Sequence, residues 1–265
     1  MDIRLDGSTR IYYVVGDPIA QAKSPTGVTE SFQNSGLNAV CIPAHVAPPQ
    51  LAAFFEAVKS MQNVDGILVT VPHKIAFAPL CDELSESARF LNAVNTVRRE
   101  NGRWVGDMFD GQAQVEALLR NGAVLEGKKA VLAGAGGAGT AIAYALVNAG
   151  VSELGIAETD AARRDSLIER LNGLGKARVY AADSDPTGFD IVINATPMGM
   201  KDGDPLPFDA AKLTAAMFVG DVVTLPETAW IKRARDAGCR TSTGLDMFAS
   251  VRDLIVDFLL ENRRA

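Results

Sequence analysis

The 265-residue sequence is poor in cysteine and histidine and has no long apolar run. No stretch approaches the about 18 uninterrupted apolar residues that a membrane-spanning helix needs, so no membrane partner is expected. The sequence has three cysteines, Cys41, Cys81 and Cys239, which lie far apart. An odd number at such spacing favours buried thiols over a disulfide framework or a zinc cluster. The histidines are far apart and no HExxH or CxxC motif occurs, so no metal site is expected. The charged first ten residues lack the apolar segment of a secretory signal, which favours a cytoplasmic location.

The charge balance gives no reason to expect a nucleic-acid partner, because 26 basic residues face 32 acidic ones and the net charge is −6. Hydrophobic residues make up 48% of the chain and charged residues 22%, which is an ordinary globular composition. At about 150 residues per domain, the length predicts two domains.

The first half alternates predicted strands with predicted helices, which favours a parallel sheet covered on both faces. Strands are predicted at 11–15, 38–43 and 66–71, and helices at 26–36, 50–61 and 74–81. Residues 93–106 contain Asn101-Gly102 between two β-rich runs, which predicts a hairpin. A helix at 110–121 follows, and this hairpin and helix are the candidate domain junction.

The second half repeats the alternation and predicts a mostly parallel sheet. Strands are predicted at 129–133, 153–157, 177–180, 191–195, 218–223 and 240–242, and helices at 140–148, 161–171 and 246–260.

The strongest motif is GAGGAG at 134–139, which satisfies GxGxxG between a predicted strand and a predicted helix. Its glycines permit a tight turn, close approach to a pyrophosphate and close helix packing, while the helix N-terminus offers free N–H groups. The alternative is a glycine-rich turn without a ligand. The motif predicts a dinucleotide site at Gly134, Ala135, Gly136, Gly137 and Ala138.

The cofactor could be NAD or NADP, and Glu158 favours NAD. It lies 24 residues after Gly134, at the end of the next predicted strand, where a carboxylate binds the ribose 2′-OH and repels a 2′-phosphate. Arg163 and Arg164 argue the other way, because an arginine can bind that phosphate. The alternative for both arginines is a solvated helix face.

Several ordered motifs resemble the shikimate dehydrogenase family. They lie at 16–25 (GDPIAQAKSP), 66–74 (GILVTVPHK), 93–96 (AVNT), 106–111 (GDMFDG), 193–200 (INATPMGM), 221–226 (DVVTLP) and 244–247 (GLDM). The resemblance is collinear and covers nearly the whole chain. It implies an α/β protein of two domains, a substrate domain of residues 1–109 plus 246–265 and a Rossmann-type NAD(P)-binding domain of residues 110–245. The last helix would return to the first domain.

The resemblance also implies the site residues. Lys74 and Asp110 match the family's catalytic pair. A lysine ammonium can donate a proton to a developing alkoxide, and a neighbouring carboxylate orients it. The implied substrate contacts are Ser24, Thr70, Asn95, Thr224, Met247 and Val251. The implied cofactor contacts, besides the glycine-rich loop and Glu158, are Thr196, Pro197, Met198 and Gly244.

The chain departs from the family pattern at seven positions, where most changes replace hydrogen-bonding groups with apolar ones. They are Ala22, Leu68, Met108, Phe109, Thr224, Asp246 and Val251. Lost hydrogen bonds predict weaker shikimate binding than the family norm, at about 1 kcal/mol per bond. The alternative is that Leu68 and Met108 are core substitutions.

The sequence therefore predicts an NAD(P)-dependent dehydrogenase acting on shikimate or a close cyclohexane carboxylate such as quinate or aminoshikimate. The alternative is a catalytically weak dinucleotide- or metabolite-binding regulatory protein of the same fold. The chain is expected to be a monomer or a homodimer.

Overall fold

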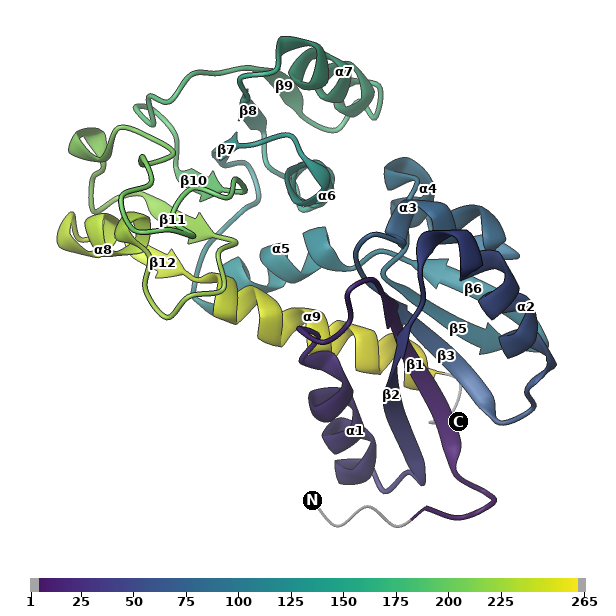
Figure 1. Ribbon diagram of the computed structural model, residues 1–265. Helices are drawn as coiled ribbons and strands as arrows, with labels where there is room; N and C mark the ends of the chain where they lie inside the picture. Colours follow the sequence, from purple (N-terminus) through teal and green to yellow (C-terminus); the bar gives the residue numbers. More distant parts are fainter. Residues whose placement is uncertain (1–4, 262–265) are drawn as a thin grey trace. The chain divides into compact units, whose positions relative to one another are not determined.

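The computed structural model describes residues 5–261, which form two compact units (Figure 1). The first unit contains the described residues up to Phe109 and those from Arg252 onward, and the second is Asp110–Val251. The second boundary falls inside the last helix, so Asp246, Met247 and Val251 belong to the second unit.

The first unit is built on a six-stranded sheet in the order β2-β1-β3-β5-β6-β4. Its strands are β1 (Arg10–Gly16), β2 (Ala39–His45), β3 (Val64–Val69), β4 (Glu83–Leu84), β5 (Thr96–Glu100) and β6 (Arg103–Asp107). β1 runs parallel to β2 and β3, whereas β5 runs antiparallel to β3 and β6. The expectation of parallel pairing is confirmed for the three strands that it covered, β1, β2 and β3. The predicted hairpin adds the antiparallel β5 and β6, because Asn101 (φ +50°) and Gly102 (φ +81°) reverse the chain.

Four α-helices accompany this sheet in the described part of the first unit, apart from the end of the last helix. They are α1 (Ser24–Asn34), α2 (Leu51–Ser60), α3 (Lys74–Phe77) and α4 (Glu86–Leu91), with 3₁₀ turns at Pro48–Gln50 and Ala78–Leu80. The sequence did not predict α4. Its start is fixed by Ser85, whose side chain accepts a hydrogen bond from the Ala88 N–H.

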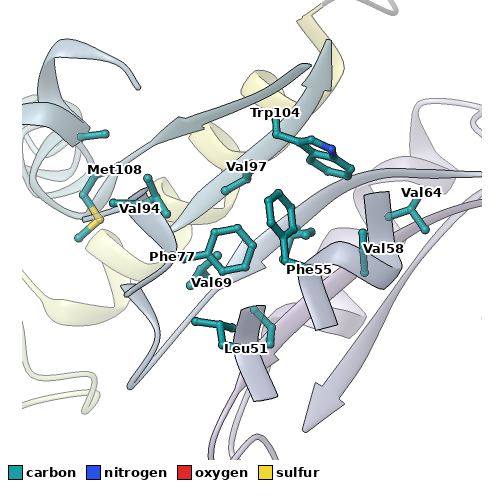
Figure 2. Close-up of a cluster of buried hydrophobic side chains, with 14 residues drawn as sticks. Leu51, Phe55, Val58, Val64, Val69, Phe77, Val94, Val97, Trp104 and Met108 are labelled. Atoms are coloured by element: carbon teal, nitrogen blue, oxygen red, sulfur yellow. The ribbon is translucent and has the colours of Figure 1, made fainter. Parts of the chain in front are cut away.

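Figure 2 shows the core of this unit, where α2, α3 and the hairpin pack together. The Phe55 ring meets the Phe77 ring edge-on at 4.8 Å and the Trp104 ring at 5.3 Å. Such aromatic pairs add about 0.5–1.5 kcal/mol each to the stabilisation from burial.

The opposite face of the sheet packs against the end of the last helix, α9 (Gly244–Leu260). A Cβ on Gly66 of β3 would lie 2.7 Å from the Leu259 side chain. Arg98 of β5 lies over the Phe258 ring at 4.3 Å and donates to the Phe258 carbonyl at 3.0 Å. The prediction that the last helix returns to the first domain is confirmed.

The second unit has a six-stranded sheet in the order β12-β11-β10-β7-β8-β9, and every pair is parallel. The strands are β7 (Lys129–Ala133), β8 (Glu153–Ala157), β9 (Arg178–Ala181), β10 (Ile191–Asn194), β11 (Phe218–Asp221) and β12 (Arg240–Ser242). The helices are α5 (Asp110–Arg120), α6 (Gly137–Asn148), α7 (Ala161–Asn172) and α8 (Ala229–Asp236), with a 3₁₀ turn at Ala210–Lys212. The doubly wound order confirms the Rossmann-type prediction, although the sequence did not predict α8.

The cysteines are free thiols, and Cys41 and Cys239 are buried. Burial raises the pKa of the Cys41 thiol and of the Cys81 thiol to about 12.

Among residues 5–261, no helix is long and apolar enough to cross a membrane, and no cluster of His, Cys, Asp or Glu could hold a metal ion.

The close packing of α5 on α6 depends on Gly111. A Cβ at this position would lie 2.0 Å from the Ala141 carbonyl oxygen, which is rigid backbone of α6. The two helices must therefore separate to accept any larger residue.

We expect Gly111→Ala to lower the free energy of unfolding by about 3 kcal/mol through overpacking. Gln112→Ala is the control, because it places the same alanine at the next position of α5, where the side chain is exposed. Denaturant unfolding of both variants measures the difference. Wild-type stability in Gly111→Ala would contradict this account of the α5–α6 contact.

Candidate functional site

The glycine-rich loop forms an open cradle between β7 and α6. Gly134 has φ +96°, and a Cβ on Gly139 would lie 2.0 Å from the Gly134 carbonyl oxygen, so the turn and the close helix approach both require glycine. A Cβ on Gly136 or Gly137 would meet nothing within 4 Å. The helix begins at Gly137, three residues before the predicted start. Its N-terminus therefore borders open space where a phosphate would be stabilised.

A pocket of about 500 Å³ lies beside this loop, at the carboxyl ends of four parallel strands. Its wall is formed by Ala133, Gly134, Ala157, Glu158, Thr159, Ala182, Asp183, Ser184, Thr196, Met198, Leu206 and Pro207. The cradle and the pocket fit a dinucleotide, because they join an apolar wall to free N–H groups. Asp183 and Ser184 were missed by the sequence analysis, although they follow β9 as Glu158 follows β8.

Glu158 is tied to the glycine-rich loop. Its carboxylate accepts hydrogen bonds from the Ala135 N–H at 2.8 Å and the Asp160 N–H at 3.0 Å. These two backbone donors, the Ala135 N–H above all, lower the pKa of Glu158 below its ordinary value. The side chain is only 10% exposed, so an ionised carboxylate is fixed at the edge of the pocket.

Both arginines that could favour a 2′-phosphate have carboxylate partners. Arg163 lies 3.7 Å from a Glu158 oxygen and 3.4 Å from an Asp160 oxygen. The Arg164 Nε lies 2.8 Å from an Asp165 oxygen. Of the residues that form the wall of this pocket in the described chain, none is lysine or arginine, whereas Glu158 and Asp183 are acidic.

The loop after β10 carries Thr196, Pro197 and Met198. Its shape depends on buried Asn194, whose side-chain oxygen accepts from the Thr196 N–H and hydroxyl and whose amide donates to the Met198 carbonyl at 3.0 Å. Thr196 and Met198 reach the pocket, whereas Pro197 is exposed.

The carboxyl end of β3 in the first unit carries three of the expected site residues, Thr70, Lys74 and Asn95. Thr70 follows β3, Lys74 opens α3, and Asn95 precedes β5, which is antiparallel to β3. Asn95 is buried, and its side-chain oxygen accepts from the Phe109 N–H at 3.2 Å. The half-buried Lys74 has its carbonyl oxygen bound by the Val94 N–H at 2.9 Å. Ser24 is the first residue of α1.

Asp110 is the first residue of α5 and belongs to the second unit. The pairing of Lys74 with Asp110 therefore stays a prediction, as do the substrate contacts. Of those contacts in the second unit, Thr224 is exposed after β11, and Met247 and Val251 are half-buried in α9. Gly244 opens α9, where a Cβ would lie 2.3 Å from the Val223 carbonyl oxygen, so packing already requires glycine there.

Three departures from the family pattern have structural partners within the first unit. Leu68 is 3% exposed in β3, and Met108 is 6% exposed in the aromatic core (Figure 2). The Phe109 ring packs edge-on against Phe258 at 5.3 Å. These positions act as core residues.

Asp246 has a local role at the start of α9. Its carboxylate accepts from the Thr243 N–H and hydroxyl, both at 2.8 Å, and the Thr243 hydroxyl accepts from the Asp246 N–H at 3.3 Å. This reciprocal arrangement is a capping box. It explains an acidic residue here without a substrate contact.

Known proteins similar to this chain include shikimate dehydrogenases. Residues 14–97 match the family model for the shikimate dehydrogenase substrate binding domain. A protein from Rubrobacter xylanophilus named shikimate dehydrogenase (NADP(+)) is 39% identical over 248 residues, covering 91% of this chain and 87% of that one.

Solved structures are similar over nearly the whole chain. Shikimate 5-dehydrogenase from Listeria monocytogenes, in complex with shikimate and NAD, is 29% identical, with a TM-score of 0.93 and coverage of 98% of this chain and 95% of that one. Ligand-free 5-ketofructose reductase of Gluconobacter sp. strain CHM43 is 31% identical, with a TM-score of 0.90 and coverage of 96% and 93%.

The capping box predicts the effect of changing Asp246. We expect Asp246→Ala to lower the free energy of unfolding by about 1 kcal/mol, because the Thr243 N–H loses its acceptor. Asp246→Glu restores the common Thr-x-x-Glu form of the box and should retain most of the stability. Thermal or denaturant unfolding checks both. Equal losses in the two variants would contradict the capping role.

Proposed function

Because the chain belongs to the shikimate dehydrogenase family of NAD(P)-dependent oxidoreductases that act on CH–OH groups, we propose that it interconverts shikimate and 3-dehydroshikimate or a close cyclohexane carboxylate pair. Quinate and aminoshikimate are the nearest alternatives. The observation that carries this proposal is the retention of Lys74 and Asp110 within motifs that match the family along the chain.

In the proposed reaction, Lys74 moves the proton at the substrate oxygen. A bound nicotinamide would accept or supply the hydride at the carbinol carbon. During ketone reduction the Lys74 ammonium donates a proton to the developing alkoxide, and during oxidation its neutral amine removes that proton. Asp110 orients the ammonium and stabilises its positive charge.

We propose NAD as the preferred cofactor. Glu158 would bind the ribose 2′-OH, and its low pKa keeps it ionised at neutral pH, where it repels a 2′-phosphate. Two further observations support the same preference. Glu158 and Asp183 are the charged side chains of the pocket wall, and Arg163 already has carboxylate partners. The name of the Rubrobacter protein, which includes NADP(+), argues against this preference. Measurements of this chain with NAD and with NADP decide which cofactor it prefers.

The first experiment is a panel of shikimate, quinate and aminoshikimate, each with NAD and NADP, followed at the absorbance of the reduced nicotinamide. 5-Ketofructose with NADH and NADPH belongs in the panel, because a similar structure has that activity in its name and Ala22 removes a hydroxyl that would bind the substrate carboxylate. We expect turnover with a cyclohexane carboxylate and a higher kcat/KM with NAD. Dinucleotide binding without turnover on any of these compounds would favour the regulatory binding protein.

Glu158→Gln tests the source of the cofactor preference. We expect kcat/KM with NADP to rise about 10-fold, because the glutamine oxygen can still accept from Ala135 while the negative charge is gone. Glu169→Gln makes the same change at an exposed position of α7 and should leave both cofactors unaffected. An unchanged NADP:NAD ratio in Glu158→Gln would contradict the electrostatic explanation.

Lys74→Ala tests the proton transfer. We expect kcat to fall about 100-fold or more, the usual contribution of a general acid–base group, while the dissociation constant for NAD stays near the wild-type value. Lys59→Ala in α2 removes a half-buried lysine of the same unit and is the control. Steady-state kinetics and cofactor titration give both quantities. Undiminished kcat in Lys74→Ala would refute the assigned role.

A further inference from the structure

A buried carboxylate, Asp221, closes β11 in the second unit. It is 0% exposed. One oxygen accepts from the Asn194 amide at 3.0 Å and the Val223 N–H at 3.1 Å, and the other accepts from the Thr228 hydroxyl at 2.6 Å. Its partners come from the end of β10, from the loop after β11 and from the residue before α8.

Asn194 extends this network into the loop after β10. Its amide donates to Asp221 and to the Met198 carbonyl, and its oxygen accepts two hydrogen bonds from Thr196. The Asn194 side chain is therefore fully hydrogen-bonded, and its orientation determines where Thr196 and Met198 lie.

Thr228 extends the network in the other direction. Its hydroxyl donates to Asp221 and accepts from the Ile231 N–H at 3.2 Å, which makes it the N-cap of α8. Through its two oxygens, Asp221 thus connects the loop after β10 to the start of α8.

This arrangement is poorly explained by stability alone. Among residues 5–261 no lysine, arginine or histidine forms an ion pair with Asp221. Burial raises the pKa of Asp221 above its ordinary value. The ionised side chain is therefore less favourable in the folded protein than in the unfolded chain at neutral pH. A buried carboxylate that adds little to stability can instead fix the orientation of the groups that it binds.

The topology indicates what the network positions. The strand order reverses between β7 and β10, and a dinucleotide binds across such a switch point. Glu158 and Asp183, at the ends of β8 and β9, lie on one side of that point, where an adenosine half would bind. Asn194 and Asp221, at the ends of β10 and β11, lie on the other.

We propose that Asp221 is a positioning residue for the dinucleotide pocket, acting through Asn194 and Thr228 on the loops that follow β10 and β11. This inference rests on the proposed dinucleotide site. It assigns Asp221 no contact with the cofactor and no part in proton transfer.

The test measures the binding of the whole dinucleotide and of its adenosine half. Asp221→Asn keeps the shape of the side chain but replaces one acceptor oxygen with an NH₂ group, so at least one of the three donors loses its partner. We expect the dissociation constant of NAD, measured by titration calorimetry, to rise about 10-fold, and that of 5′-AMP to rise as well, because Thr196 and Met198 line the pocket beside Glu158.

A second pair of variants changes the network from its other end. Thr228→Ser keeps the hydroxyl and should bind NAD as the wild type does, whereas Thr228→Val keeps the shape, loses the hydroxyl and should weaken NAD binding. Asn172→Ala is the control for lost stability. It removes two hydrogen bonds to Val179 at the opposite end of β9 and should lower the melting temperature without changing either affinity.

The outcomes separate the two proposals. A wild-type protein that binds neither NAD nor NADP overturns the proposed function and this inference with it. If the wild-type protein binds NAD, the positioning role alone is overturned when folded Asp221→Asn binds NAD equally well, or when Asn172→Ala loses NAD affinity to the same extent as Asp221→Asn. If Asp221→Asn does not fold, the Thr228→Val and Thr228→Ser pair decides by the same criterion.

Discussion

Parallel pairing of strands is the constraint on which the second unit depends. Each parallel strand must be followed by a connection that returns to the start of the next strand. The carboxyl ends of all the strands therefore lie along the same side of the sheet. At that edge the chain places Glu158 after β8, Asp183 after β9, Asn194 at the end of β10 and Asp221 at the end of β11. The same strands thus build both parts of the unit: their apolar interiors form the core, and the polar residues at their ends form the candidate cofactor site.

Two carboxylates at this edge are stabilised in different ways. Glu158 accepts hydrogen bonds from two backbone N–H groups near the pocket surface. They favour the ionised carboxylate and lower its pKa below the ordinary value. Asp221 accepts a similar number of hydrogen bonds, but complete burial outweighs them and its pKa is high. The first carboxylate can select a ligand by charge, whereas the second can only orient its neighbours.

Much of this architecture could be predicted from the sequence, because local signals determine it. GxGxxG between a strand and a helix, Glu158 at the next strand end and Asn101-Gly102 in a hairpin are all short-range patterns. The short helices α4 (Glu86–Leu91) and α8 (Ala229–Asp236) were missed, because too few residues repeat in either for the spacing of apolar side chains to stand out. Their caps, Ser85 and Thr228, mark where they begin. The significance of Phe109 was also beyond sequence reasoning, since its partner Phe258 lies about 150 residues away. The same holds for the Asp221 network, which joins three separate segments.

The first unit is discontinuous in the chain, and this affects the order in which the protein can fold as it leaves the ribosome. Domains usually fold as units, the N-terminal one first. Here Gly66 and Arg98 pack against Leu259 and Phe258, which are synthesised only after the whole second unit. The second unit is continuous from Asp110 to Val251, so it can complete its sheet first. Until α9 is made, the part of the first sheet around Gly66 and Arg98 stays uncovered, although Phe32 of α1 already packs on Tyr12 of the same face. The first unit can therefore complete its core only after the second unit has been synthesised.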